Sequence, residues 1–154
     1  MGGKEETIAD IMEKKVLVAD LNSNARDCAK AMSKRGVSSA VVVQGRNALG
    51  IVTERDLVSK VMADGLEGTK VLVRDIMSTP LITVAPDATM TKASEIMAEY
   101  RIRRLVVIDK SGNLAGIVTA GDIARTLAEG KGYQEATFNA LARYKEGNES
   151  GPYQ

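Results

Sequence analysis

A short motif that could bind an anion and a sugar occurs twice in this chain of 154 residues. Gly-Ile-Val-Thr-x-x-Asp ends at Asp56 in the first copy and at Asp122 in the second. We expect Thr53 and Thr119 to lie where a strand passes into a helix, since backbone N–H groups and the helix dipole favour phosphate there. The Asp three residues later is placed to accept hydrogen bonds from the vicinal hydroxyls of a ribose.

The same residues also fit a purely structural role. Thr53-x-x-Asp56 and Thr119-x-x-Asp122 are forms of the capping box, in which the two side chains satisfy the first N–H groups of their own helix. For one isolated copy, capping is the default interpretation. Two copies at matched positions of a repeat favour binding, and both roles stay open.

The motif belongs to a longer internal repeat. Ala9–Met12 recurs as Arg74–Met77, an offset of 65 residues that also relates Ala40–Val43 to Leu105–Ile108. The two Gly-Ile-Val-Thr motifs are offset by 66 residues, because one extra residue falls in the hairpin turn at 109–113. The chain therefore contains two copies of one structural unit.

Each copy predicts the order strand, helix, strand, strand, helix. Extended segments at 16–18 and 81–84 precede helices that Asn22 and Asp87 could cap. Hairpins follow, and the closing helices end at Gly65 and Gly130. About 60 residues cannot bury both faces alone, so we expect an α/β (α+β) fold of two tandem β-α-β-β-α repeats, packed with pseudo-two-fold symmetry around one aliphatic core.

The domain boundaries follow from the repeat. Residues 1–66 form the first repeat with its N-terminal lead-in, and residues 67–130 form the second. Residues 131–154 have no repeat partner, and we expect a C-terminal helix with Phe138, Leu141 and Ala142 on one apolar side, then a flexible tail.

Composition limits the function classes. With no His and one Cys, the common zinc sites and Ser-His or Cys-His nucleophile pairs cannot be assembled, and no carboxylate pair is visible, so we do not expect an enzyme. Cys28 falls on the apolar side of a predicted helix and is expected to be a buried structural thiol. A net charge of +1 gives no electrostatic case for a nucleic-acid or membrane partner. With no signal peptide or apolar span, we expect a cytoplasmic protein.

The ordered set of motifs resembles the CBS domain. The resemblance rests on Asp10-Ile11-Met12 and Asp75-Ile76-Met77, on the doubled Gly-Ile-Val-Thr-x-x-Asp, on Val84-x-Pro86-Asp87 and on Arg103–Val107, and it covers residues 7–130. It implies a stand-alone CBS-domain pair, or Bateman module, with two clefts between the repeats for AMP, ADP, ATP or a related adenosyl ligand, and no further cofactor. Val41 and Val106 stand where the family often has Pro, which leaves the shape of the adenine pocket open.

The resemblance also implies which residues line each cleft. Cleft A would combine Thr53 and Asp56 with Thr83, Arg103, Arg104 and Leu105 of the other repeat. Cleft B would combine Thr119 and Asp122 with Val18, Val37, Ser38 and Ser39. Because arginine suits phosphate, we expect cleft A to prefer the more anionic ligand. The alternative for the arginines is a solvated strand edge.

The implied function is a ligand-sensing regulatory module that signals by a conformational shift to an unidentified regulated protein. The resemblance also implies a homodimer, for which Leu57 and Val61, or Ile123 and Leu127, could supply the contact. The alternatives are a scaffold for oligomerisation with empty clefts and, with less support, a nucleic-acid-binding module using Arg101, Arg103 and Arg104.

Overall fold

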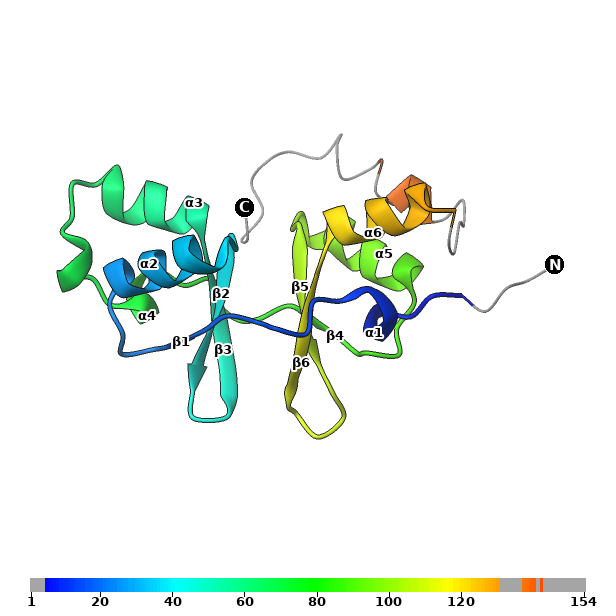
Figure 1. Cartoon of the computed structure of the whole chain (residues 1–154), viewed down its shortest axis with the longest axis horizontal. Helices are drawn as coiled ribbons and strands as arrows, with labels where there is room; N and C mark the ends of the chain where they lie inside the picture. Colours follow the sequence, from blue (N-terminus) through cyan, green and yellow to red (C-terminus); the bar gives the residue numbers. More distant parts are fainter. Residues whose placement is uncertain (1–4, 131–136, 141, 143–154) are drawn as a thin grey trace. The chain divides into compact units, whose positions relative to one another are not determined.

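A computed structural model describes residues 5–130, 137–140 and 142, and they form two compact units (Figure 1). The first-repeat unit comprises Val16–Leu81, and the second-repeat unit comprises the described residues within Met1–Lys15 and Ile82–Pro152. This confirms the predicted α/β (α+β) class with tandem repeats.

The first-repeat unit is a three-stranded sheet with helices against it. Its strand order is β1-β2-β3, with β1 parallel to β2 and β2 antiparallel to β3, and Val41 pairs with Ile51. Buried aliphatic side chains of the sheet and helices form its core. Its elements are β1 (Val18–Asp20), α2 (Ala25–Arg35), β2 (Ser39–Gln44), β3 (Asn47–Thr53), α3 (Glu54–Leu57), the π-helical turn η1 (Val58–Met62), the 3-10 turn η2 (Gly68–Lys70) and α4 (Val73–Ile76).

The second-repeat unit has the same topology. Its strand order is β4-β5-β6, with one parallel and one antiparallel pairing, and Val106 pairs with Ile117 at the position equivalent to Val41 and Ile51. Its elements are α1 (Ile8–Ile11), β4 (Thr83–Val84), α5 (Met90–Tyr100), β5 (Arg104–Ile108), β6 (Leu114–Thr119) and α6 (Ala120–Ala128).

The two lead-in segments are exchanged between the repeats. The Ser78 amide donates to the Ile51 carbonyl at 2.8 Å, so the segment that precedes the second repeat in the sequence pairs with β3 of the first. The Glu13 amide donates to the Ile117 carbonyl at 2.9 Å, so the N-terminal segment pairs with β6. The compact units therefore differ from the sequence repeats at their lead-ins, and each lead-in pairs with the last strand of the other repeat.

The predicted helix caps are displaced by two residues. Asn24, rather than Asn22, caps α2 by accepting from the Asp27 amide at 2.8 Å. Asn22 instead accepts a hydrogen bond from the Arg74 guanidinium. Thr89, rather than Asp87, caps α5 by accepting from the Lys92 amide at 3.0 Å.

The C-terminal segment packs differently from the prediction where it is described. Residues 137–140 are helical, but Thr137 and Ala140 are the buried positions, while Phe138 and Ala142 are exposed. The Thr137 hydroxyl forms a hydrogen bond with that of Thr91 on α5. The predicted tail, and Leu141, lie outside the described residues. Across the part of the chain that is described, no helix has the length and apolar character needed to cross a bilayer.

Candidate functional site

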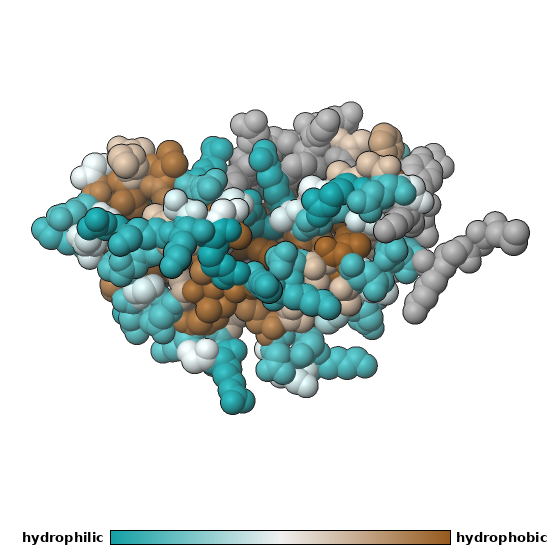
Figure 2. All heavy atoms as spheres, in the orientation of Figure 1, coloured by the Kyte–Doolittle hydropathy of each residue, from teal (hydrophilic) through white to brown (hydrophobic). Residues whose placement is uncertain are grey.

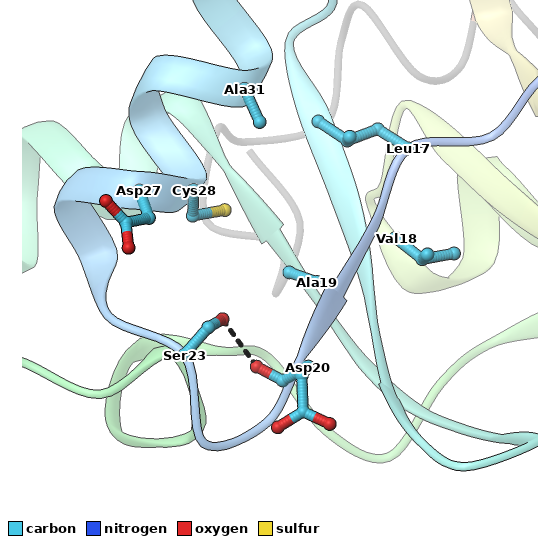
Figure 3. Close-up of a pocket in the computed structure, with 8 residues that line it drawn as sticks. All are labelled: Leu17, Val18, Ala19, Asp20, Ser23, Asp27, Cys28 and Ala31. Atoms are coloured by element: carbon cyan, nitrogen blue, oxygen red, sulfur yellow. Dashed lines mark hydrogen bonds between the residues drawn. The ribbon is translucent and has the colours of Figure 1, made fainter.

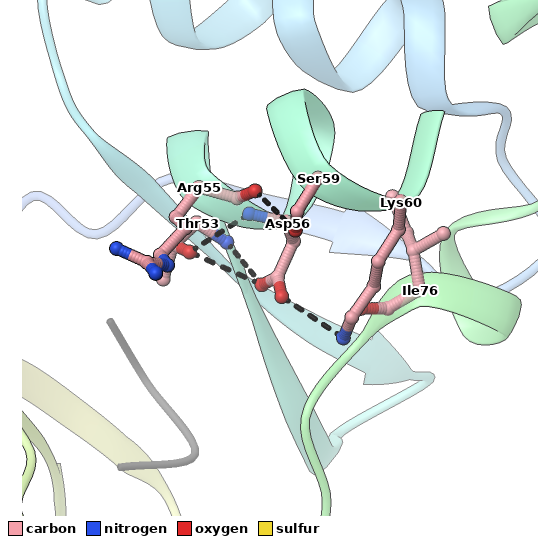
Figure 4. Close-up of polar contacts among 6 residues, drawn as sticks. All are labelled: Thr53, Arg55, Asp56, Ser59, Lys60 and Ile76. Carbon is pink, nitrogen blue, oxygen red and sulfur yellow. Dashed lines mark hydrogen bonds and ion pairs between the residues drawn. The ribbon is translucent and has the colours of Figure 1, made fainter. Parts of the chain in front are cut away.

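The first copy of the motif forms a complete capping box (Figure 4). Asp56 Oδ2 accepts from the Thr53 amide at 2.8 Å and from the Thr53 hydroxyl at 3.2 Å, and Thr53 Oγ1 accepts from the Asp56 amide at 3.3 Å. Both residues are buried, at 2% and 6% exposure. The structural role expected for these residues is therefore present, and it fixes the orientation of the Asp56 carboxylate.

The other carboxylate oxygen of Asp56 binds a cation. Lys60 Nζ lies 3.0 Å from Asp56 Oδ1, one helical turn further along. The same Nζ donates to the Ile76 carbonyl at 2.9 Å (Figure 4). Lys60 was not among the site residues predicted from the sequence, although an Asp and a Lys four residues apart on a helix are a recognisable signal for an ion pair.

The second copy forms the same box with a different cation. Asp122 Oδ2 accepts from the Thr119 amide at 2.9 Å, and Thr119 Oγ1 accepts from the Asp122 amide at 3.1 Å. Asp122 Oδ1 is bound by Arg125 Nη2 at 2.7 Å, and the Arg125 side chain is 65% exposed. Both motif carboxylates thus use one oxygen for the cap and one for a basic side chain of their own helix.

The helix starts offer fewer open amides than the sequence led us to expect. The Glu54 amide donates to the Ser38 carbonyl at 3.0 Å, and the Ala120 amide donates to the Arg103 carbonyl at 2.8 Å. The third amide of each helix is taken by the Thr hydroxyl. An anion at either helix start would therefore depend on side chains more than on these backbone donors.

The remaining candidates of the first-repeat unit lie in β1, at the start of β2 or just before β2. Ser39 pairs in register with Thr53, Ser38 binds the first amide of α3, and Val37 precedes them. Val18 lies in β1 with 49% of its surface exposed.

The candidates of the second-repeat unit surround the other motif. Arg104 pairs with Thr119, the Arg103 carbonyl binds the first amide of α6, and Thr83 pairs with Val106. Leu105 is fully buried, so its side chain packs inside the protein. Each unit thus brings a motif together with the short polar or basic run of the same repeat. The combination of residues across the repeats into clefts A and B stays a prediction.

A separate hollow of about 210 Å³ lies between β1 and α2 (Figure 3). It is lined by Leu17, Val18, Ala19, Asp20, Ser23, Asp27, Cys28 and Ala31. Cys28 is buried, and the loss of solvent raises the pKa of its thiol to about 11. The burial of Cys28 confirms the prediction of a buried thiol, and the raised pKa disfavours the reactive thiolate form.

Comparison with known proteins identifies one family. The sequence model described as CBS domain matches residues 8–63 and 73–129. An uncharacterized protein of Methanopyrus kandleri is 38% identical over 118 residues, which are 76% of this chain and 60% of that protein. The chain thus spans less than two thirds of this relative's length.

Solved structures show the same fold. The CBS domain pair of protein MJ0100, in complex with 5-methylthioadenosine and S-adenosyl-L-methionine, is 26% identical with a TM-score of 0.75, covering 83% of this chain and 100% of that chain. A CBS domain protein from Pyrobaculum aerophilum complexed with AMP is 22% identical with a TM-score of 0.72, covering 89% of this chain and 98% of that chain.

Proposed function

This chain belongs to the CBS domain family and carries two copies of the domain in tandem, and on that basis we propose that it is a non-enzymatic regulatory module that binds an adenosine nucleotide. The adenosyl ligands of the similar solved structures support the ligand class. Binding would shift the geometry of the repeats, and a separate protein would respond to that shift.

The observation that carries the proposal is the state of the two motif carboxylates. Each is held in place by its cap through Oδ2, and its Oδ1 binds a side-chain cation that solvent can reach. A vicinal diol can compete for such an oxygen, since an ionised carboxylate oxygen accepts more than one hydrogen bond.

We assign Thr53 and Asp56 to one binding site and Thr119 and Asp122 to the other. Thr83, Arg103, Arg104 and Leu105 would complete the first site, and Val18, Val37, Ser38 and Ser39 the second. In this assignment the arginines favour the more anionic nucleotide at the first site.

Calorimetric titration with AMP, ADP, ATP and S-adenosyl-L-methionine tests the proposal, with GMP and CMP as controls for the base. We expect heat with at least one adenosine ligand and none with CMP. Asp56→Ala and Asp122→Ala should each remove one site. Absence of binding by every adenosine probe would overturn the proposal.

The competing function is a scaffold in which the boxes only cap their helices. The observation that favours it is that both boxes are complete in the polypeptide alone. A scaffold predicts that Thr53→Ala lowers stability while the titrations show no ligand. Sensing predicts that the same variant also weakens nucleotide binding.

We also propose that the module is a homodimer, with a contact surface that differs from the one expected from the sequence. Val61 and Ile123 are buried in their own units, so they cannot supply the contact. Val58, Met62 and Leu66, spaced four residues apart, are 61%, 77% and 51% exposed, and Figure 2 shows an apolar area over α3 and η1. This stripe supports a contact through the first repeat.

A further inference from the structure

One ammonium group joins the first candidate binding site to the lead-in of the second repeat. Lys60 Nζ contacts Asp56 Oδ1 at 3.0 Å and the Ile76 carbonyl at 2.9 Å (Figure 4). Ile76 is the last residue of α4. Two residues later, Ser78 pairs with Ile51 of β3, and the chain then passes into the second-repeat unit at Ile82. Lys60 therefore links Asp56 through polar contacts to the segment that connects the two repeats, which ends at Leu81.

The two partners of this ion pair differ in how easily they can move. The Asp56 side chain is 9% exposed and is fixed by the cap, whereas the Lys60 side chain is 44% exposed. Lys60 borders a surface hollow of about 700 Å³ that is also lined by Asp64, Asp75 and the ion pair of Glu67 with Lys70. The ammonium can thus leave Asp56 without losing either water or nearby negative charge, and so lysine is the partner that moves.

The described residues of the second repeat show no equivalent bridge. Thr126 stands at the position of Lys60 and donates its hydroxyl to the Asp122 carbonyl at 2.8 Å. Asp122 Oδ1 is bound by Arg125, three residues along the helix and 65% exposed. The two motifs therefore form the same cap. They differ in the basic residue that binds Oδ1 of the Asp carboxylate, which is Lys60 for Asp56 and Arg125 for Asp122.

We propose that Lys60 is a positioning residue that couples occupancy of Asp56 to the α4 lead-in. A ligand hydroxyl that binds Asp56 Oδ1 displaces the ammonium toward the carboxylates of the hollow, and the bond to the Ile76 carbonyl breaks. A ligand in the site of Thr53 and Asp56 therefore loosens the segment that connects the repeats. A ligand in the site of Thr119 and Asp122 does not. This coupling rests on the proposed function, because that function supplies the ligand. The bridge from Asp56 through Lys60 to the Ile76 carbonyl is present without any ligand-based assumption.

A ligand-free experiment tests the bridge. Hydrogen exchange of the Met77 and Ser78 amides is measured in the unaltered protein and in the Asp56→Asn, Lys60→Met and Asp122→Asn variants. The Asn side chain keeps an oxygen for the Thr53 amide but has no charge to hold Lys60. We expect Asp56→Asn and Lys60→Met to accelerate exchange at these amides by roughly threefold to tenfold.

Two controls separate the bridge from general loss of stability. The Cys28 amide, bonded to the Asn24 carbonyl within the same unit, should keep its rate in all variants. Asp122→Asn should leave Met77 and Ser78 unchanged. Equal acceleration at Cys28, or no acceleration at Met77 and Ser78 in Asp56→Asn, would overturn the inference.

The same amides are then followed with saturating AMP. We expect AMP to accelerate Met77 and Ser78 in the unaltered protein and to have no further effect on them in Lys60→Met, which should still bind AMP. Binding of AMP to the unaltered protein without acceleration would overturn the coupling and leave the proposed function standing. Failure of AMP and the other adenosine probes to bind would overturn the proposed function and the coupling together.

Discussion

Gly50 lies directly against Met77 within the first-repeat unit. A Cβ atom on Gly50 would stand 2.8 Å from Met77 Sδ and 2.7 Å from the Ser78 carbonyl oxygen. In the second-repeat unit, a Cβ on Gly116 would stand 2.7 Å from Met12 Sδ and 2.8 Å from the Glu13 carbonyl oxygen. In each unit, the glycine of a Gly-Ile-Val-Thr motif thus packs against the methionine of an Asp-Ile-Met segment.

We expect Gly50→Ala and Gly116→Ala each to lower the free energy of unfolding by roughly 1–3 kcal/mol, because the added methyl group forces the lead-in off the sheet. Chemical denaturation measures the loss. Gly121→Ala is the matched control, since a Cβ there would meet only the Thr119 hydroxyl at 3.5 Å in a helix. It should be neutral or slightly stabilising. Loss of stability in the control as large as in Gly50→Ala would contradict the explanation.

Thr53→Ala should cost about 1–2 kcal/mol of stability, because it removes the side-chain oxygen that caps α3. Thr119→Ala should cost a similar amount at α6. Thermal or chemical denaturation of the apo protein gives these values. Ser59→Ala serves as control, because the exposed Ser59 hydroxyl only bonds back to the Arg55 carbonyl of its own helix. An unchanged midpoint in Thr53→Ala would show that the box does not stabilise the helix.

Met62→Lys should shift the protein toward monomer, because it places a charge in the middle of the Val58, Met62 and Leu66 stripe. Light scattering coupled to size-exclusion chromatography reports the mass. Ala128→Lys is the matched substitution in the second repeat, 66 residues later and also exposed. Under our proposal it leaves the dimer intact. A monomeric unaltered protein, or dissociation by both variants alike, would refute the assigned surface.

Cys28 should react with a thiol reagent at pH 8 about a hundredfold more slowly than an unfolded control, because a pKa near 11 rather than 9.0 lowers the thiolate fraction by that factor. The folded-state pKa is raised, so the associated stability is present below pH 9 and is lost as the pH rises toward 11. Denaturation curves across this range should show a steeper decline for the unaltered protein than for Cys28→Ala. Parallel declines would show that Cys28 is not the titrating group.

The repeat itself could be predicted from the sequence because its offset is nearly constant, and the hairpin that absorbs the extra residue was identifiable from its turn residues. The exchange of lead-ins could not. Asp10-Ile11-Met12 and Asp75-Ile76-Met77 have the same pattern, so either segment fits either sheet, and only the path of the chain decides which one it reaches.

The details missed at the site have similar causes. Asn22 and Asn24 are both good capping residues, and the contact of Asn22 with Arg74, 52 residues away, is not visible in a local pattern. Val61 was expected on an open surface because helical spacing defines an apolar side without telling which part of that side the core covers. The second partner of Lys60, the Ile76 carbonyl, is a backbone group that no pattern of side chains reveals.

The exchanged lead-ins also fix an order of events during synthesis. The first-repeat unit has all of its strands and its borrowed α4 once Leu81 has left the ribosome. Glu13 is synthesised well before its pairing partner, Ile117, which lies in the last strand of the described fold. The pairing of Glu13 must therefore wait until β6 has been translated, whereas Thr7 can pair with Thr89 sooner.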